Sequence, residues 1–221
     1  MRLTRCACSP YRLPLRQPWA SARGGFDVRE GWLVRLATDA GLVGYGDCAP
    51  LPQTGTESMD SAAACLSGWV AALPGLSLEE ALGRIDASAA GAPAACCGLE
   101  TALLDLLAQQ AGIPLARWLN PDAASEVRVN AVLGGLDGQT LERALVAVAE
   151  GYSVLKLKVG LAAGREEIPL LHDLARCLPA GVSLRLDANC AWNERDAENF
   201  LGALAGLPVE SVEDPLHSPD R

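Results

Sequence analysis

Residues 154–161, VLKLKVGL, decide how the second half of the chain is interpreted. The stretch has the apolar composition of a buried parallel strand, but it carries Lys156 and Lys158 two residues apart. Successive side chains of a strand point to opposite faces, so both ammonium groups are expected on the same face. Parallel strands covered by helices are nearly all apolar, so two like charges here need an explanation.

Charged side chains recur at the corresponding place in the next two predicted strands. SLRLDAN carries Arg185, Asp187 and Asn189 at alternate positions, and VESVEDP carries Glu213. Asp187 follows Lys158 by 29 residues and Glu213 follows Asp187 by 26, so one strand–helix unit separates each group from the next. These residues are therefore predicted at the C-terminal ends of neighbouring parallel strands, where α/β proteins build their active sites.

The residue types at these strand ends indicate a common chemistry. Asp187 and Glu213 supply the carboxylate oxygens that Mg²⁺ prefers. A bound Mg²⁺ would stabilise negative charge on a substrate carboxylate, and a lysine on the neighbouring strand could remove the proton alpha to it. Two ammonium groups a few ångströms apart disfavour each other's protonation, which would help one of the lysines to act as a base.

Each of these residues also has a structural interpretation. A single lysine near a strand end is usually solvated, and a single aspartate after a strand is usually a helix N-cap. Asn193 is the better cap for the following helix, because Asp196 lies three residues further on. Helix capping therefore does not explain Asp187. Charged groups at corresponding positions of three successive strands favour a functional site.

The rest of the second half repeats the same order of elements. A strand is predicted over residues 127–132, and helices follow it and each of the next two strands at intervals of 25 to 30 residues. This order is typical of a parallel sheet or barrel. Residues 126–221 are therefore predicted to form the first part of a (β/α) barrel, with about three and a half of its eight units.

Residues 1–125 have a different pattern and are predicted to form an α+β domain. Strand-like segments come first, and TDAG (residues 38–41) is predicted as the turn of a hairpin. Residues 20–31, ASARGGFDVREG, are polar and contain glycine, which is typical of a mobile loop. Three helical stretches follow, at residues 57–73, 77–88 and 91–112.

Composition excludes several classes of partner. The net charge is −9 and no block of Lys or Arg occurs, so neither a nucleic acid nor an anionic membrane surface is an expected partner. The chain has no apolar run near the roughly 20 residues that span a bilayer. Its start lacks the apolar region of a signal peptide. The eight cysteines do not form C-x-x-C pairs, so we expect reduced, structural thiols in a cytoplasmic protein.

Several motifs resemble those of a known family. KLKVG, LRLDANCAW and VESVEDPL resemble the K-x-K, D-x-N and E-[ED]-P motifs of the enolase superfamily, muconate-lactonizing subgroup. REGWLVRL, GLVGYGDCAPLP and CCGLETALLDLLAQ are similar to the capping domain of that subgroup. Within it, the GDCAPLP loop, LKVGL and the arginine of LRLDAN most resemble the o-succinylbenzoate synthases of menaquinone biosynthesis.

The resemblance implies an α+β capping domain followed by an incomplete enolase-type barrel. It implies a Mg²⁺-dependent dehydration of a small cyclohexadiene carboxylate, with loop 20–31 as a lid over the substrate. The roles that it implies are a general base and its assistant, two metal ligands and two residues of the substrate shell: Lys158, Lys156, Asp187, Glu213, Arg185 and Asn189.

The resemblance also implies a third metal carboxylate and a second catalytic lysine on later strands, beyond Arg221. We therefore expect the chain to be an N-terminal fragment that holds Mg²⁺ weakly, is inactive alone and associates through its open sheet edge. Two alternatives stay open. One is a dipeptide epimerase or N-acylamino acid racemase of the same superfamily, and the other is a non-catalytic half-barrel that serves as a binding module.

Overall fold

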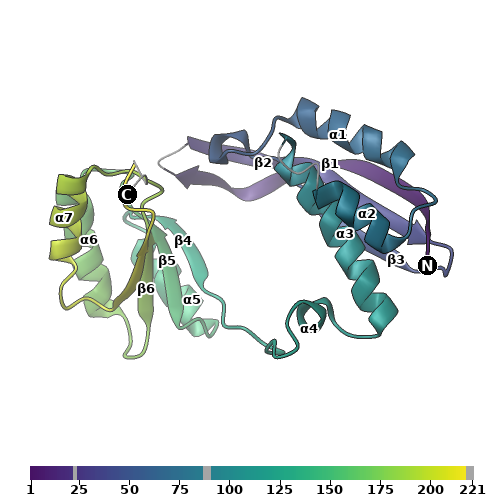
Figure 1. Ribbon diagram of the computed structural model, residues 1–221. Helices are drawn as coiled ribbons and strands as arrows, with labels where there is room; N and C mark the ends of the chain where they lie inside the picture. Colours follow the sequence, from purple (N-terminus) through teal and green to yellow (C-terminus); the bar gives the residue numbers. More distant parts are fainter. Residues whose placement is uncertain (22–23, 87–90, 218–221) are drawn as a thin grey trace. The chain divides into compact units, whose positions relative to one another are not determined.

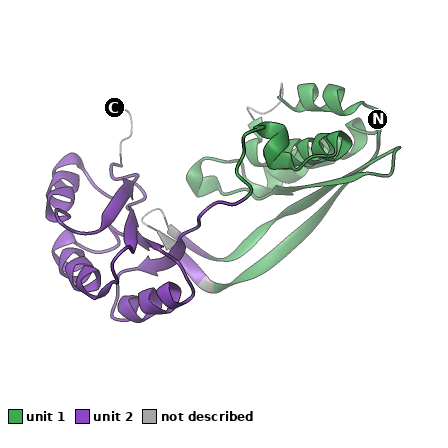
Figure 2. Cartoon of the chain, turned by 90° about the horizontal axis from the view of Figure 1, so that it is seen from below, with its two compact units in different colours: residues 1–16, 27–125 green, residues 17–26, 126–221 purple. Residues whose placement is uncertain are grey.

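The computed structural model describes residues 1–21, 24–86 and 91–217. The chain divides into two compact units, coloured separately in Figure 2. Unit 1 comprises residues 1–16 and 27–125, and unit 2 comprises residues 17–26 and 126–221. The end of the first hairpin thus belongs to unit 2.

The sheet of unit 1 has three strands in the order β1-β2-β3. Its hairpin around TDAG is confirmed, because β2 and β3 pair in antiparallel register up to Ala37 and Val43. The backbone N–H of Thr38 donates to the carbonyl of Leu42 at 3.0 Å, which closes the turn. The strands are β1 (Leu3–Ser21), β2 (Gly24–Thr38) and β3 (Val43–Cys48).

The mobile loop predicted over residues 20–31 is wrong for the residues that the structure describes. β1 continues to Ser21 and β2 begins at Gly24, while residues 22 and 23 lie outside the described part. Strand pairing uses backbone groups, and a strand with a solvent-facing side tolerates polar side chains. The polar composition of this stretch therefore did not exclude a long hairpin.

The three helices predicted in unit 1 are present within two residues of their predicted bounds, apart from the predicted end of the second at residue 88, which lies outside the described residues; η1 and α4 were not predicted. Ser77 and Glu80 form a reciprocal capping box, with backbone N–H to side-chain distances of 2.9 and 3.2 Å. The longest helix starts with Pro93 and ends before Gly112, whose φ of 69° is left-handed. The helices are η1 (Pro52–Thr54), α1 (Met59–Ala72), α2 (Leu78–Asp86), α3 (Pro93–Ala111) and α4 (Leu115–Leu119).

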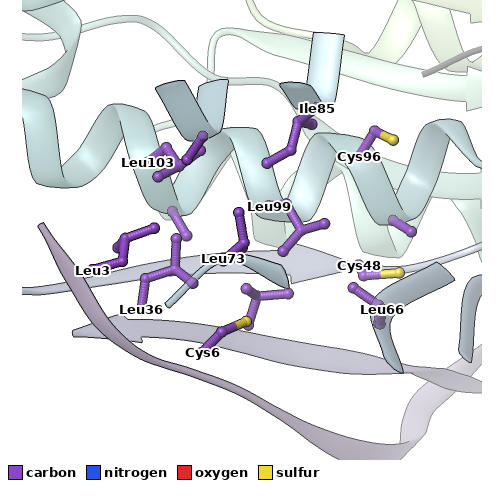
Figure 3. Close-up of a cluster of buried hydrophobic side chains, with 14 of the residues drawn as sticks. Leu3, Cys6, Leu36, Cys48, Leu66, Leu73, Ile85, Cys96, Leu99 and Leu103 are labelled. Carbon is purple, nitrogen blue, oxygen red and sulfur yellow. The ribbon is translucent and has the colours of Figure 1, made fainter. Parts of the chain in front are cut away.

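The core of unit 1 forms where α3 lies on the sheet (Figure 3). Leu99 and Leu103 of α3 are fully buried and face Leu36 of β2. The backbones approach closely, since a Cβ added to Gly46 would lie 1.8 Å from the carbonyl oxygen of Gly98. A side chain at this position of β3 would therefore push α3 off the sheet.

Unit 2 is a four-stranded parallel sheet in the order β4-β5-β6-β7, with one helix in each connection (Figure 1). The predicted parallel strand–helix architecture of an incomplete barrel is confirmed. The strands are β4 (Ala131–Gly135), β5 (Val154–Lys158), β6 (Ser183–Asp187) and β7 (Val209–Glu213). The helices are α5 (Thr140–Ala149), α6 (Gly164–Cys177) and α7 (Glu194–Ala203).

The first strand of unit 2 starts four residues later than predicted. Val127, inside the predicted strand over 127–132, is 80% exposed and precedes β4. β4 has the sequence AVLGG and pairs with β5 from Ala131 onward, with a register shift around Leu133. Val127 and Val129 alternate as in a strand, but the pairing with β5 begins only at Ala131, so the pattern before it does not form a strand.

The two faces of this sheet differ in chemistry. Leucines at alternate positions of β5 and β6 are fully buried and pack in one cluster with helix residues such as Leu171 and Phe200. Lys156, Lys158 and Asp187 alternate with these leucines, so they lie on the opposite face. The charges therefore lie on the face of the sheet opposite to its helix-packed side.

The eight cysteines all lie in the described part of the chain, and none of them forms a disulfide there. Cys6, Cys48 and Cys96 are buried, whereas Cys97 and Cys177 are exposed, so a structural role holds for only part of the set. Burial raises the pKa of Cys96 to about 11. Among the described residues, no helix has the length and apolarity needed to cross a membrane.

Candidate functional site

Strand register brings three of the predicted site residues into one row. Lys158 on β5 is opposite Asp187 on β6, and Asp187 is opposite Glu213 on β7. Each is the last residue of its strand. The row therefore lies at the C-terminal edge of the sheet, as predicted. Lys156 lies one row earlier, opposite Arg185.

A network of ion pairs joins the row. Nζ of Lys158 donates to Oδ2 of Asp187 at 2.7 Å and to Oδ1 of Asn189 at 2.8 Å. Nζ of Lys156 lies 3.0 Å from the same Oδ2 and donates to Oε2 of Glu213 at 2.5 Å. Two ammonium groups and two carboxylates thus balance in charge, and Lys158 and Asp187 are only 4% and 5% exposed.

The pKa values of this network follow from its contacts. Burial by itself lowers the pKa of Lys156, but hydrogen bonds with Glu213 and Asp187 outweigh burial and raise it. Burial likewise acts to raise the pKa of Asp187, but hydrogen bonds from Lys158 and Lys156 hold it below its usual range. The carboxylates therefore favour the charged form of Lys156, the lysine that the sequence analysis placed beside the base, Lys158.

The backbone is unusual where β6 and β7 end. Asn189, Cys190 and Asp214 have φ values of 47°, 63° and 44°. Asn and Asp tolerate this left-handed region, but Cys does so rarely. The N–H of Cys190 donates to the carbonyl of Asp214 at 2.6 Å, and this bond ties the two segments together. Strained backbone of this kind often accompanies functional sites.

Arg185 does not join the network. Its Nε donates to Oε1 of Glu210 on β7, and Glu210 also accepts from the hydroxyl of Ser183 at 2.6 Å. Asn189 is different, because it contacts Lys158 directly and its backbone N–H donates to Asp187 at 3.0 Å. The structure thus brings together Lys156, Lys158, Asp187, Asn189 and Glu213, and pairs Arg185 elsewhere.

Trp19 is a further candidate site residue, which the sequence pattern did not reveal. It belongs to the hairpin segment 17–26 of unit 2, and Nζ of Lys158 lies 5.0 Å from the centroid of its ring. Trp19 also stacks on Phe26, with ring centroids 6.4 Å apart. A tryptophan next to a polar stretch was the available signal, but that stretch was interpreted as a loop.

A second missed signal lies in the composition. Of the 18 basic Lys and Arg residues, 16 are arginine, and Lys156 and Lys158 are the two lysines. Arginine remains protonated in proteins, whereas lysine can lose its proton and act as a base. Both lysines of the chain therefore lie at the strand-end network, where a side chain that can lose its proton could serve as a base.

The carboxylates suit a divalent cation in charge and in ligand type. Asp187 and Glu213 end neighbouring strands in register, and each already binds an ammonium group through one oxygen. Hard carboxylate oxygens are the ligands that Mg²⁺ prefers. Within the part of the chain that the structure describes, no group of three or more His, Cys, Asp or Glu residues converges to hold a metal ion.

Comparison with known proteins identifies relatives for both units. Residues 6–119 match the family profile "Mandelate racemase / muconate lactonizing enzyme, N-terminal domain". Residues 139–221 match the profile "Enolase C-terminal domain-like". The two matches follow one another along the chain and together cover most of it.

Curated relatives and solved structures agree with these profiles. The L-Ala-D/L-Glu epimerase of Bacillus subtilis is 30% identical over 100% of this chain and 62% of its own length. The o-succinylbenzoate synthase of Thermosynechococcus vestitus is 33% identical over 96% of this chain and 60% of its own. A crystal structure of the dipeptide epimerase from Enterococcus faecalis, complexed with Mg and the dipeptide L-Leu-L-Tyr, is 26% identical with a TM-score of 0.84. That structure aligns over 98% of this chain and 62% of its own.

The chain thus spans about three fifths of the length of the curated relatives that it matches, with 62% and 60% of their residues aligned. A match to more than half of the chain by one family profile, in line with the fold and with the strand-end residues, establishes the family. The chain belongs to the enolase superfamily, within the mandelate racemase and muconate lactonizing enzyme family.

Proposed function

We propose that unit 2 carries part of an active site that moves a proton at the carbon alpha to a carboxylate. The reaction is epimerisation of a dipeptide or racemisation of an N-acylated amino acid. The observation that carries the proposal is the buried pair at the strand ends, with Nζ of Lys158 2.7 Å from Asp187. The names of two relatives, the L-Ala-D/L-Glu epimerase and the dipeptide epimerase, support the choice of reaction.

Lys158 acts as the general base in this proposal. A base must present a lone pair, but Nζ of Lys158 donates to Asp187 and Asn189. The base becomes available when the charge of Asp187 is taken up by another cation and the lysine proton leaves. Lys156 stays protonated, because its pKa is raised, and it supplies fixed positive charge beside the base.

Asp187 and Glu213 would hold Mg²⁺. When bound there, the ion would supply positive charge to the substrate carboxylate and favour loss of the alpha proton. Trp19 covers Lys158 with its ring and limits the access of water to the base. Asn189 orients Nζ of Lys158 through its side-chain oxygen. Arg185 reaches a substrate only after it leaves Glu210.

Dehydration in the manner of an o-succinylbenzoate synthase is the second candidate. The relative from Thermosynechococcus vestitus, at 33% identity, favours it. Both reactions begin with removal of the alpha proton, so the same base serves each. They differ afterwards, because epimerisation returns a proton to the opposite face whereas dehydration expels water.

Proton exchange in D₂O separates these candidates. The substrates are a panel of dipeptides, N-succinyl amino acids and the cyclohexadiene carboxylate precursor of succinylbenzoate, with Mg²⁺ present. The assay uses the 221 residues and also the longest in-frame product of the same coding sequence, because the relatives are longer. Proton NMR follows loss of the alpha proton, and ultraviolet absorbance follows aromatisation.

We expect alpha-deuterium exchange with dipeptides or acylated amino acids in the longer product, and its loss in Lys158→Ala. Aromatisation without exchange would replace the main proposal with the second candidate. If a folded, Mg²⁺-loaded product does neither, the catalytic proposal is wrong and a binding module remains. Glu166→Gln, on an exposed helix position, is the control for loss of one charged side chain.

A further inference from the structure

Glu167 on α6 is a buried carboxylate that the proposed chemistry does not use. It is 2% exposed, and none of the described lysines, arginines or histidines forms an ion pair with it. Its oxygens accept three consecutive backbone N–H groups instead. Oε2 accepts from Gly160 at 2.8 Å, and Oε1 accepts from Leu161 and Ala162, each at 3.1 Å.

These three amides belong to the turn that directly follows Lys158. Val159 lies between Lys158 and these amides. Its N–H donates to the carbonyl of Asp187 at 3.0 Å and extends the pairing of β5 with β6. Gly160 has a left-handed φ of 75°, and an added Cβ would lie 2.5 Å from Cβ of Ala191. The backbone after Lys158 is therefore held by the sheet on one side and by Glu167 on the other.

The arrangement differs from an ordinary helix cap. A capping side chain accepts N–H groups from the first turn of its own helix. α6 begins at Gly164, and its N-cap Ala163 makes no side-chain cap bond. Glu167 accepts amides that precede the helix, so it fixes the turn rather than the helix end. A buried carboxylate without partners is very unfavourable, so carboxylate and turn hold each other in place.

We propose that Glu167 is a positioning residue for Lys158: it holds the turn at Gly160–Ala162 so that the amine of Lys158 stays beside Asp187 and Asn189. This inference rests on the proposed function, because it matters for catalysis only if Lys158 is the base. Small displacements of a reacting group reduce turnover strongly, by up to about 100-fold per ångström.

The composition of the chain makes the proposal directly measurable. Lysine labelled with ¹³C and ¹⁵N gives two side-chain signals, from Lys156 and Lys158, and Lys156→Arg assigns them. In Glu167→Gln, the amide side chain cannot accept on both of its atoms, so at least one bond to the turn is lost. We expect the Lys158 signal to shift or broaden in this variant, while the Lys156 signal changes little.

Matched variants separate positioning from general damage. Glu166→Gln makes the same chemical change on an exposed neighbour and is expected to leave both lysine signals in place. Glu167→Asp keeps the charge and is expected to give an intermediate effect, which serves as the second variant if Glu167→Gln does not fold. In Glu167→Gln, exchange of the amides of residues 160–162 is expected to rise about 10-fold or more.

The proposal is overturned if these amides exchange faster while the Lys158 signal stays unchanged, since Glu167 would then only stabilise the turn. In the longer product, kcat for alpha-proton exchange is expected to fall about 10-fold or more in Glu167→Gln, with KM unchanged. A rise in KM alone would also overturn it. If the parent protein shows no exchange at all, the proposed function fails, and the lysine signals still decide whether Glu167 positions Lys158.

Discussion

Asp187 occupies a special place among the strand-end residues because both lysines share one of its oxygens. Lys158 and Lys156 lie 2.7 and 3.0 Å from Oδ2, and the N–H of Asn189 donates to Oδ1. Glu213 has a simpler environment, with Lys156 at 2.5 Å and a half-exposed side chain. Removal of Asp187 would thus leave two cations without their common partner.

We predict that Asp187→Asn destabilises the protein more than Lys158→Met does. After Lys158→Met, the aspartate keeps Lys156 and the new side chain is apolar. After Asp187→Asn, buried positive charge lacks a counter-ion, which costs about 3 kcal/mol or more. Urea unfolding measures both, and Asp173→Asn on the exposed side of α6 is the control, with a change within about 0.5 kcal/mol. A larger loss of stability in Lys158→Met than in Asp187→Asn would contradict the prediction.

The same residues set the pH dependence of stability. The folded-state pKa of Asp187 is lowered, so its contribution is present above about pH 4 and is lost as the pH falls through the folded value. The pKa of Lys156 is raised, so its contribution is present below about pH 10.4 and is lost as the pH rises through the folded value. We expect thermal melts to show a plateau between these limits. An acid limb that is identical in Asp187→Asn would contradict this assignment.

At the scale of single elements, α7 starts where the sequence predicts. The side chain of Asn193 accepts from the N–H of Asp196 at 2.9 Å, which confirms it as the N-cap. This leaves the acid of the preceding strand, Asp187, free for the ion-pair network. Cap and site residue are thus six positions apart and serve different purposes.

We predict that Asn193→Ala lowers the free energy of unfolding by about 1 kcal/mol, because the first turn of α7 loses its cap. Asn199→Ala is the matched control. Asn199 is exposed in the middle of the same helix, where alanine is the better helix former. Equal effects of the two substitutions in urea unfolding would show that the cap contributes nothing.

The sequence predicted β5 and β6 because their alternation of leucine with charge defines two faces, and it predicted β7 because VESVE follows one strand–helix unit later. It placed the start of β4 four residues too early, since a strand of sequence AVLGG is selected by pairing with β5 rather than by its own pattern. It also missed the partner of Arg185. A register shift between Leu184 and Arg185 decides which residues of β7 lie beside it, and sequence alternation does not reveal such a shift.

At the scale of the whole molecule, the sheet of unit 2 ends in two strands whose outer edges have no partner among the described strands. These are β4 and β7. Apolar side chains are exposed near the first edge, including Val132 at 51% and Val146 at 54%. Unpaired parallel edges and exposed apolar surface both promote association.

We predict that the 221 residues associate with increasing concentration, and that Val132→Lys combined with Val146→Lys reduces the association. Sedimentation velocity over a concentration series measures this. Leu33→Lys, at an exposed apolar position of unit 1, is the control and is expected to leave association unchanged. A chain that remains monomeric and unfolds cooperatively would contradict the prediction.

The scarcity of lysine has a practical consequence for anyone who handles this protein. Crosslinkers, biotin esters and acylating metabolites normally modify many surface lysines and leave function intact. Here the two side-chain amines are those of Lys156 and the buried Lys158, both bound to carboxylates at the strand ends. Amine coupling that reached either lysine would attach the protein through its own candidate site, so immobilisation should use an exposed thiol such as Cys177.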